Sequence, residues 1–345
     1  MNRVSTNLIS IAALVIILAA ARTAQGILLP FFLAVFISII AAAPVAWMRH
    51  KRVPAGLAVM IVIIAMIGLL FATSLILATS IESFSQTLPI YLDRLKDSTA
   101  GFLQWLNNVG VDVPEEGFRS ILDAGAAMRF ANTILGSLTQ LLSNTFLIAM
   151  TVIFILLEAS VFSEKIEHIR NDAGKTLANI SGFLDDTKHY MAIKAVTSLI
   201  TGILISIGMV ILGVDYPILW GFLAFLLNFI PTIGSIIAAV PAVLLALLQL
   251  GFVSSLIVAG VFLAVNFLIG NVVEPRVMGR GVGLSTLVVF LSLVFWGWLF
   301  GPIGMLLSIP LTMLVKFGAE SNEDTRWIAV LLSSVSATAE ADSPR

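Results

Sequence analysis

Long apolar runs separated by short polar stretches dominate the 345-residue chain. A hydrocarbon core of about 30 Å is crossed by roughly 20 residues of helix, so the longer runs predict membrane-spanning helices. Shorter runs form two pairs, one around Pro231 and Gly234 and one around Gly301 and Pro302. The longer runs cover residues 8–21, 27–47, 54–79, 137–161, 195–213 and 253–273, and the shorter runs cover 216–230, 234–250, 284–300 and 302–318.

Composition supports a membrane protein. Hydrophobic residues make up 59% of the chain, charged residues make up 11%, and the mean hydropathy is +1.05. Soluble domains have about 25% charged residues. The chain is therefore expected to be an all-α polytopic membrane protein, with the lipid membrane as its surroundings. A net charge of -1 without a cluster of Lys and Arg indicates no nucleic-acid partner.

Basic residues predict the orientation, because Lys and Arg near the ends of spans are retained in the cytoplasm. They follow the runs at 27–47, 137–161 and 253–273, which places both termini in the cytoplasm. The segment from Ser80 to Thr133 then lies outside, and it carries seven acidic against four basic residues. The basic residues are Arg49, Lys51, Arg52, those from Lys165 to Lys194, Arg276, Arg280 and Lys316.

Two segments between the spans show amphipathic patterns. In 162–194, apolar residues recur at spacings of three and four, which predicts one helix, or two helices broken near Gly174 or Gly182. This helix either lies on the membrane surface or forms a seam between protomers. Apolar clusters in the outer segment are interrupted by Pro89 and Pro114 and are expected to be interfacial.

The chain therefore divides into six parts. They are N-terminal spans (1–79), an outer-face amphipathic segment (80–136), a span (137–161), a cytoplasmic amphipathic helical segment (162–194), a transport-type membrane region with two hairpins (195–319) and a cytoplasmic tail (320–345).

The paired short runs raise a specific question, because each contains helix-breaking residues at membrane depth. Each pair is either two full spans or one re-entrant hairpin. As hairpins, the first would open outward and the second toward the cytoplasm, an inverted pair of the kind that builds substrate sites in transporters. Non-helical backbone at that depth requires protein or a watery cavity beside it. The candidate solute-binding residues are Asn228, Pro231, Thr232, Gly234 and Ser235 in the first tip and Gly301 and Gly304 in the second; an ordinary tight turn is the alternative.

A further group of polar residues lies near the cytoplasmic end of the 253–273 run. Asn271 and Glu274 are three residues apart, which predicts a shared helix face, and Pro275 predicts the end of the helix. Acidic residues within membranes are functional candidates by default. Glu274 is therefore either a substrate-site residue or an interfacial staple paired with an arginine.

Catalytic and cofactor signals are absent from the sequence. The three histidines, His50, His168 and His189, show no metal-binding spacing, and no Gly-rich phosphate loop is present. The chain has no cysteine, which excludes disulfides and thiolate chemistry. We expect neither an enzyme nor a cofactor nor a bound metal.

Three stretches are similar to the autoinducer-2 exporter family: LLPFFLAVFISIIAAAPVAW, FLLNFIPTIGSIIAAVPA and NVVEPRVMGRGVGLSTLVVFLSLVFWGWLFGPIGMLLSIPLTMLVK. The resemblance implies about eight membrane-spanning elements in a bacterial inner membrane, a permease that exports the quorum-sensing signal autoinducer-2, and a homo-oligomer such as a pentamer. Some relatives resemble sodium/proton antiporters. The family pattern singles out Asn228, Pro231, Gly234, Pro241, Asn271, Glu274, Pro275, Gly279, Gly297, Gly301, Gly304 and Pro310.

Three functions follow as hypotheses. The first is a secondary transporter for autoinducer-2, a small polar solute, in which the hairpin region moves relative to the first four spans. The second is a monovalent cation/proton antiporter with Glu274 or Glu158 as the titrating group. The third is a channel or a non-transporting membrane scaffold.

Overall fold

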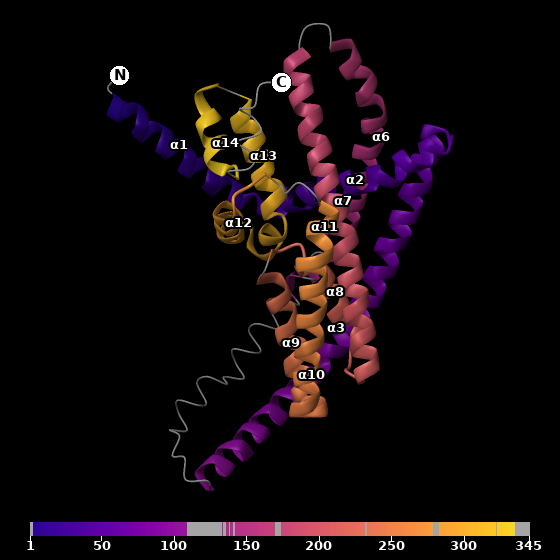
Figure 1. The fold of residues 1–345 in the computed structure, drawn as a ribbon, viewed down its shortest axis with the longest axis vertical. Helices are drawn as coiled ribbons and strands as arrows, with labels where there is room; N and C mark the ends of the chain where they lie inside the picture. The colour runs from indigo at the N-terminus through magenta and orange to yellow at the C-terminus, as the bar shows by residue number, and fades with distance from the viewer. Residues whose placement is uncertain are drawn as a thin grey trace.

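The structure, a computed structural model, describes residues 3–108, 133, 136–137, 139–140, 142–169, 174–231, 233–278, 283–321 and 323–334 (Figure 1). Within these residues every element is a helix, apart from one antiparallel bridge between Leu284 and Ser333. The expected all-α architecture is therefore confirmed.

The described residues of the N-terminal half contain four helices. They are α1 (Arg3–Thr23), α2 (Gln25–His50), α3 (Ala55–Asn108) and α6 (Thr145–Ile169). Helix α3 contains 54 residues and passes through Pro89, between two of the apolar clusters; Pro114 lies outside the described residues. The helix is about 80 Å long at 1.5 Å per residue, which carries the span far into the segment expected on the outer face. Helices α2, α3 and α6 share a core of small and branched side chains, including Ala34, Val59 and Val152.

Helix α7 (Gly174–Leu212) joins the amphipathic segment to the following span. It begins at Gly174, where a break was predicted, and it continues through Gly182. A helix that lay along a membrane surface before residue 195 would need a bend there. The structure shows a single helix of 39 residues across this junction, and the position of its first part, on the membrane surface or in a seam between protomers, stays a prediction.

The first hairpin consists of α8 (Pro217–Leu227) and α9 (Ile233–Leu250). Its base is closed by Gln249, which accepts a hydrogen bond from the backbone N–H of Asp215 at 3.0 Å and donates one to the Gly213 carbonyl at 3.1 Å. Helix α10 (Phe252–Asn266) then runs beside α9 and α7 (Figure 1). It continues into a π-helix, η1 (Phe267–Val273), and into α11 (Glu274–Met278).

The second hairpin consists of α12 (Thr286–Leu306) and α13 (Ser308–Glu320). Gly301 interrupts α12 with φ 68° and ψ -156°, a conformation that glycine adopts without the steric cost of a side chain. The predicted break at Gly301 and Pro302 is thus confirmed. The second arm accordingly starts at Pro302.

The C-terminal segment closes the base of the second hairpin. After η2 (Glu323–Thr325) and α14 (Arg326–Leu332), the Leu332 carbonyl accepts a hydrogen bond from the Ser285 backbone N–H at 3.1 Å. Lys316 Nζ donates to the Gly283 carbonyl at 3.1 Å. We call the contacts of 283–285 with Lys316 and 332–334 the C-terminal clasp. It ties the start of the hairpin to its end.

Six helices in the described part of the chain are long and apolar enough to cross a membrane. They are Gln25–His50, Ala55–Thr87, Gly182–Leu212, Ile233–Leu250, Phe252–Met278 and Thr286–Leu306, with shorter apolar helices at Ala12–Thr23, Thr145–Glu158 and Pro217–Leu227. The predicted polytopic membrane class is confirmed by this pattern.

Next to the C-terminal clasp, α13 packs on α7 through two stacked aromatic rings. The Phe183 and Phe317 rings lie 4.5 Å apart at an interplanar angle of 21°. We expect Phe317→Ala to lower the free energy of unfolding by about 1–2 kcal/mol, because the stack and its buried area are lost. Thermal unfolding of the detergent-solubilised protein measures this effect. Phe290→Ala, which removes a ring that is 53% exposed, should leave the melting temperature unchanged; equal shifts for both variants would contradict the assignment.

Candidate functional site

A row of buried polar side chains follows one face of α7. They recur at spacings of three and four residues, which is the period of a single helix face. The Thr201 hydroxyl donates to the Thr197 carbonyl at 2.9 Å, and the Thr197 hydroxyl donates to the Lys194 carbonyl at 3.2 Å. This face is turned into the protein, away from lipid. Its members are Thr187, Tyr190, Lys194, Thr197, Ser198 and Thr201.

Lys194 forms an ion pair with Glu274 at the start of α11. Its Nζ lies 2.8 Å from Oε1 and 3.0 Å from Oε2 of the carboxylate. The two side chains are only 7% and 16% exposed. The arginine partner predicted for Glu274 is therefore wrong among the described residues: Arg276 is exposed, and Arg280 lies outside the described part. A lysine that the charge pattern placed at the cytoplasmic flank supplies the opposite charge.

The π-helix η1 explains why Asn271 and Glu274 separate. Hydrogen bonds in a π-helix run from i to i+5, so residues three apart no longer lie above one another as in an α-helix. Asn271 is exposed, whereas Glu274 is turned inward to Lys194. The predicted shared face is consequently not present. Single π turns inside α-helices occur frequently at functional sites.

The first hairpin tip meets the same face of α7 one turn further along. Asn228, directly after α8, donates from Nδ2 to the Ser198 hydroxyl at 2.9 Å. Ser198 follows Lys194 by four residues, so the two contacts lie about 6 Å apart along the helix axis. The ion pair and the hairpin tip are therefore neighbours.

The two tips are closed in the same way. A Cβ atom on Gly234 would overlap the Leu227 carbonyl oxygen of the opposite arm, and a Cβ atom on Gly304 would overlap the Trp296 carbonyl oxygen. In the second hairpin, Trp296 Nε1 also donates to the Thr312 hydroxyl at 2.9 Å. Each tip thus requires a glycine three residues after Pro231 or Gly301 so that its two arms can approach.

An apolar cluster joins the tips to each other and to α2. It contains Phe229 from the first tip, Phe300 and Ile303 from the second, and Leu29 from α2. The rings of Phe32 and Phe300 lie 6.2 Å apart. We call this group the tip cluster. It brings together segments that are more than seventy residues apart in the sequence.

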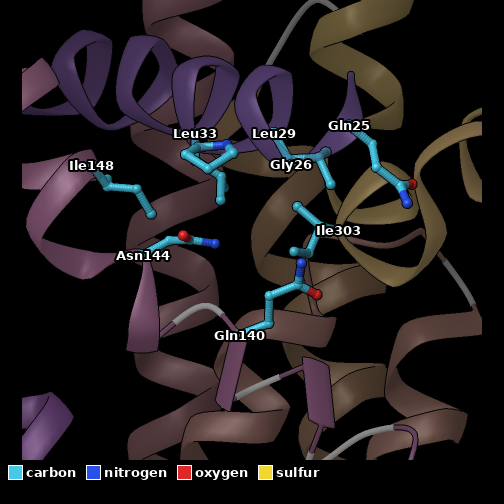
Figure 2. A pocket seen from close by; sticks show the side chains of 9 residues that line it. Gln25, Gly26, Leu29, Leu33, Gln140, Asn144, Ile148 and Ile303 are labelled. Carbon is cyan, nitrogen blue, oxygen red and sulfur yellow. The ribbon is translucent and has the colours of Figure 1, made fainter. Parts of the chain in front are cut away.

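A small hollow lies beside the tip cluster (Figure 2). Its walls come from the start of α2, from the segment before α6 and from the second hairpin. Nine residues line it: Gln25, Gly26, Leu29, Pro30, Leu33, Gln140, Asn144, Ile148 and Ile303.

The predicted site residues thus fall into distinct places. Asn228, Pro231, Gly234 and Ser235 lie in or beside the first tip, Gly301 and Gly304 lie in the second, Glu274 lies in the ion pair, Asn271 is exposed, and Thr232 is outside the described residues.

Sequence reasoning missed Lys194 and Ser198 as well as the hollow. The polar row on α7 had a signal, because its spacing of three and four continues across residue 194 into the span. The sequence contained no such signal for Gln25, Gln140 and Asn144, because segments far apart in the chain bring these residues together. All of these contacts come from tertiary packing.

The ion pair makes a testable contribution to stability. Removing one partner of a buried pair leaves an uncompensated charge and costs about 3–5 kcal/mol. We expect Lys194→Met and Glu274→Gln each to lower the melting temperature of the purified protein strongly, whereas the double variant should recover most of the loss.

The exposed pair of Lys188 and Asp185 provides the control. Its nitrogen–oxygen distance is 3.4 Å, and the side chains are 49% and 75% exposed, so Lys188→Met should change stability by less than about 1 kcal/mol. Additive losses from the two single variants at 194 and 274, without recovery in the double variant, would show that the two charges do not stabilise each other.

Comparison with known proteins places this geometry in a family. A model described as AI-2E family transporter matches residues 11–320. The AI-2 transport protein TqsA of Escherichia coli K12 is 40% identical over 325 residues, which cover 94% of each chain. A Haemophilus influenzae protein, whose name proposes transport without a substrate, is 41% identical over 337 residues that cover 95% of this chain and 96% of the relative. YhhT of Escherichia coli K12, named in the same way, is 35% identical over 94% of this chain and 93% of its own length. The family match spans both hairpins, the ion pair and the N-terminal helices, and the chain therefore belongs to the AI-2E transporter family.

Proposed function

We propose that this protein is a secondary transporter that exports autoinducer-2 across the bacterial inner membrane. The observation that carries the proposal is the meeting of the first hairpin tip with the polar face of α7, where Asn228 donates to Ser198 beside the Lys194–Glu274 pair. Both elements lie in the family match. The substrate follows from the relative TqsA, whose name assigns it to AI-2 transport, and the export direction follows from the family resemblance.

Helix length supports a re-entrant first hairpin. Helix α8 has 11 residues and is about 16 Å long, roughly half of a hydrocarbon core of about 30 Å. Its tip contacts Ser198, which lies near the middle of the apolar helix Gly182–Leu212. Helix α8 starts beside the end of α7 and stops at the level of Ser198. It would therefore enter the membrane without crossing it. The pair α8 and α9 therefore counts as one membrane element.

The second hairpin supports the inverted arrangement. Its two arms, separated at Gly301, share a closed base and a glycine-closed tip with the first hairpin. The α10 span lies between the two hairpins, so the two bases face opposite sides. With both termini in the cytoplasm, this gives eight membrane elements, of which six are spans and two are hairpins, the first open to the outside and the second open to the cytoplasm. Such pairs of broken helices form substrate sites near the membrane midplane.

Transport would occur by movement of the hairpin region, 195–319, relative to the N-terminal helices and α6. A homo-oligomer, of which a pentamer is one form, would hold those helices in place, with the cytoplasmic segment 162–194 as a seam between protomers. Energy would come from an ion gradient or from the solute's own gradient. The backbone groups and small polar side chains at the tips offer both donors and acceptors to a neutral solute.

A cation/proton antiporter is the second candidate, and the buried ion pair is the observation in its favour. A carboxylate held next to an ammonium group at membrane depth can exchange its partner for a cation or a proton. Glu274 is the better-placed group, because it is paired with Lys194 and only 16% exposed, whereas Glu158 on α6 is exposed. Membership of a transporter family argues against a non-transporting scaffold.

The tip glycines test the transport proposal. Gly234→Val and Gly304→Val should reduce efflux of labelled autoinducer-2 from proteoliposomes by at least about tenfold, because the added side chain forces the arms of each hairpin apart. Gly260→Val is the matched control, since a Cβ there meets nothing within 4 Å. Normal efflux by both tip variants at equal membrane insertion would refute the role of the tips.

A doubly neutral variant separates the two candidate functions. Lys194→Gln combined with Glu274→Gln removes both charges together, so neither is left unpaired. For the exporter, we expect autoinducer-2 efflux within about threefold of the unmodified protein. For the antiporter, sodium-driven proton flux in the same vesicles should disappear, and its persistence would exclude Glu274 as the titrating group.

A further inference from the structure

Helix α3 contributes to two separate apolar cores. Near its start, Val59 and Val62 pack with α2 and α6. Further along, Leu77, Phe84 and Tyr91 pack with α7, the first hairpin and α10. Figure 1 shows the same passage of α3 from α2 and α6 to α8 and α9. One helix therefore joins the N-terminal helices to the region that is proposed to move.

Between these two cores, packing does not anchor α3. None of residues 67–76 is buried, and none of them is a member of either core. The stretch is about 15 Å long at 1.5 Å per residue. Parts of a structure with few buried apolar contacts deform at a lower cost in free energy than the packed parts beside them. A bend in α3 is therefore most readily accommodated within this stretch.

Hydrogen bonds tie the second of these parts of α3 to the base of the first hairpin. The Tyr91 hydroxyl donates to Oδ2 of Asp215 at 2.8 Å. The Tyr216 hydroxyl lies 3.1 Å from the Thr87 hydroxyl and 3.3 Å from the Ser83 carbonyl. The three residues of α3 are four apart in the sequence, so one face of the helix meets the hairpin base.

Aromatic packing reinforces these hydrogen bonds. Phe84 meets the rings of Tyr216 and Trp220 edge to face, at centroid distances of 5.5 and 5.4 Å. The Tyr216 backbone is left-handed, with φ 58° and ψ 46°, and a bulky residue keeps this conformation only when its surroundings fix it. We call this group of contacts the outer clamp. Its members are Ser83, Phe84, Thr87, Tyr91, Asp215, Tyr216 and Trp220.

The second hairpin meets α1 and α2 through contacts of a different kind. The tip cluster joins it to α2 by apolar side chains, and the Arg22 guanidinium of α1 lies 5.2 Å from the centre of the Trp298 ring. Apolar contacts are non-directional, whereas hydrogen bonds weaken steeply when their geometry changes. Movement of the hairpin region should therefore displace it relative to α1 and α2, while the outer clamp stays closed.

We infer that residues 77–91 of α3 move with the first hairpin as one body, held by the outer clamp, and that α3 bends within residues 67–76. The inference rests on the proposed transport function and adds which part of the N-terminal half takes part in the movement. Only the first part of α3, packed with α2 and α6, then stays with the N-terminal helices. The outer clamp transmits the movement of the hairpin base to the rest of α3 beyond Tyr91.

Cross-linking across the outer clamp tests the inference. The chain contains no cysteine, so Thr87→Cys combined with Tyr216→Cys provides a single pair of thiols for a short bifunctional reagent. Because both positions belong to one body, we expect the linked protein to retain efflux of labelled autoinducer-2 within about twofold of the same variant before linking. A loss of at least about tenfold on linking, with normal efflux from the unmodified protein, would overturn the inference and leave the exporter intact.

A second link provides the contrast. Arg22→Cys combined with Trp298→Cys allows α1 to be joined to the second hairpin, and these two parts are expected to be displaced relative to each other. We expect this link to lower efflux at least about tenfold relative to the same variant before linking. Unchanged efflux after both kinds of link would refute movement of the hairpin region relative to the N-terminal helices, and the inference with it.

Distances between spin labels give a readout that does not depend on transport. Labels on Ile90→Cys and Ile236→Cys lie within the proposed body. Labels on Ile64→Cys and Ile236→Cys lie on opposite sides of residues 67–76, and all three positions are exposed. We expect saturating autoinducer-2 to shift the distance distribution of the second pair and to leave that of the first pair unchanged. Equal shifts in both pairs, or no shift in either pair, would overturn the inference.

The two readouts separate the inference from the proposed function. Absence of efflux from the unmodified protein would refute the exporter. A shift confined to the pair at 64 and 236 would in that case still support the bend in α3 and the body held by the outer clamp.

Discussion

The packing of α11 and the first hairpin tip against the polar face of α7 is the constraint on which the arrangement of the transport region depends, and the Lys194–Glu274 ion pair is one of its two polar contacts. Two charges removed from water are stable only when each satisfies the other, and here the ammonium group contacts both carboxylate oxygens. The pair fixes the end of α10 and its π-helical turn against α7. Ser198, one helical turn further, can then receive the amide of Asn228 at the first hairpin tip.

Backbone constraints explain the rest of the region. Inside a membrane, a chain that leaves the helical path must satisfy its N–H and C=O groups within the protein. In both hairpins a side chain closes the base by a hydrogen bond to a backbone carbonyl, Gln249 in the first and Lys316 in the second. At each tip, a glycine allows the two arms to come into contact. Each hairpin is therefore a self-contained unit. An apolar cluster between such units permits relative movement more readily than directional hydrogen bonds would.

The fold was largely predictable because apolar runs and helix breakers are local properties. The runs predicted the helices, and Pro302 with Gly301 predicted the break that the structure shows. The length of α3 was not predictable, since Pro89 lies in the interior of a helix that continues to Asn108. The site was predictable only in part. Lys194 was assigned to a cytoplasmic flank by its charge, and its partner Glu274 lies eighty residues away, so only tertiary packing reveals the pair.

The central claim is that the hairpin region moves relative to the N-terminal helices, so that the polar face of α7 beside the first hairpin tip becomes accessible from each side of the membrane during transport. Ser198→Cys tests it most directly, because this position is fully buried in the present state and the chain has no other cysteine. We predict that a membrane-impermeant thiol reagent modifies it from either side of oriented proteoliposomes and that autoinducer-2 slows the reaction, while Ser255→Cys, similarly buried on α10, stays unreactive. A transport-competent Ser198→Cys protein that is unreactive from both sides would contradict the account.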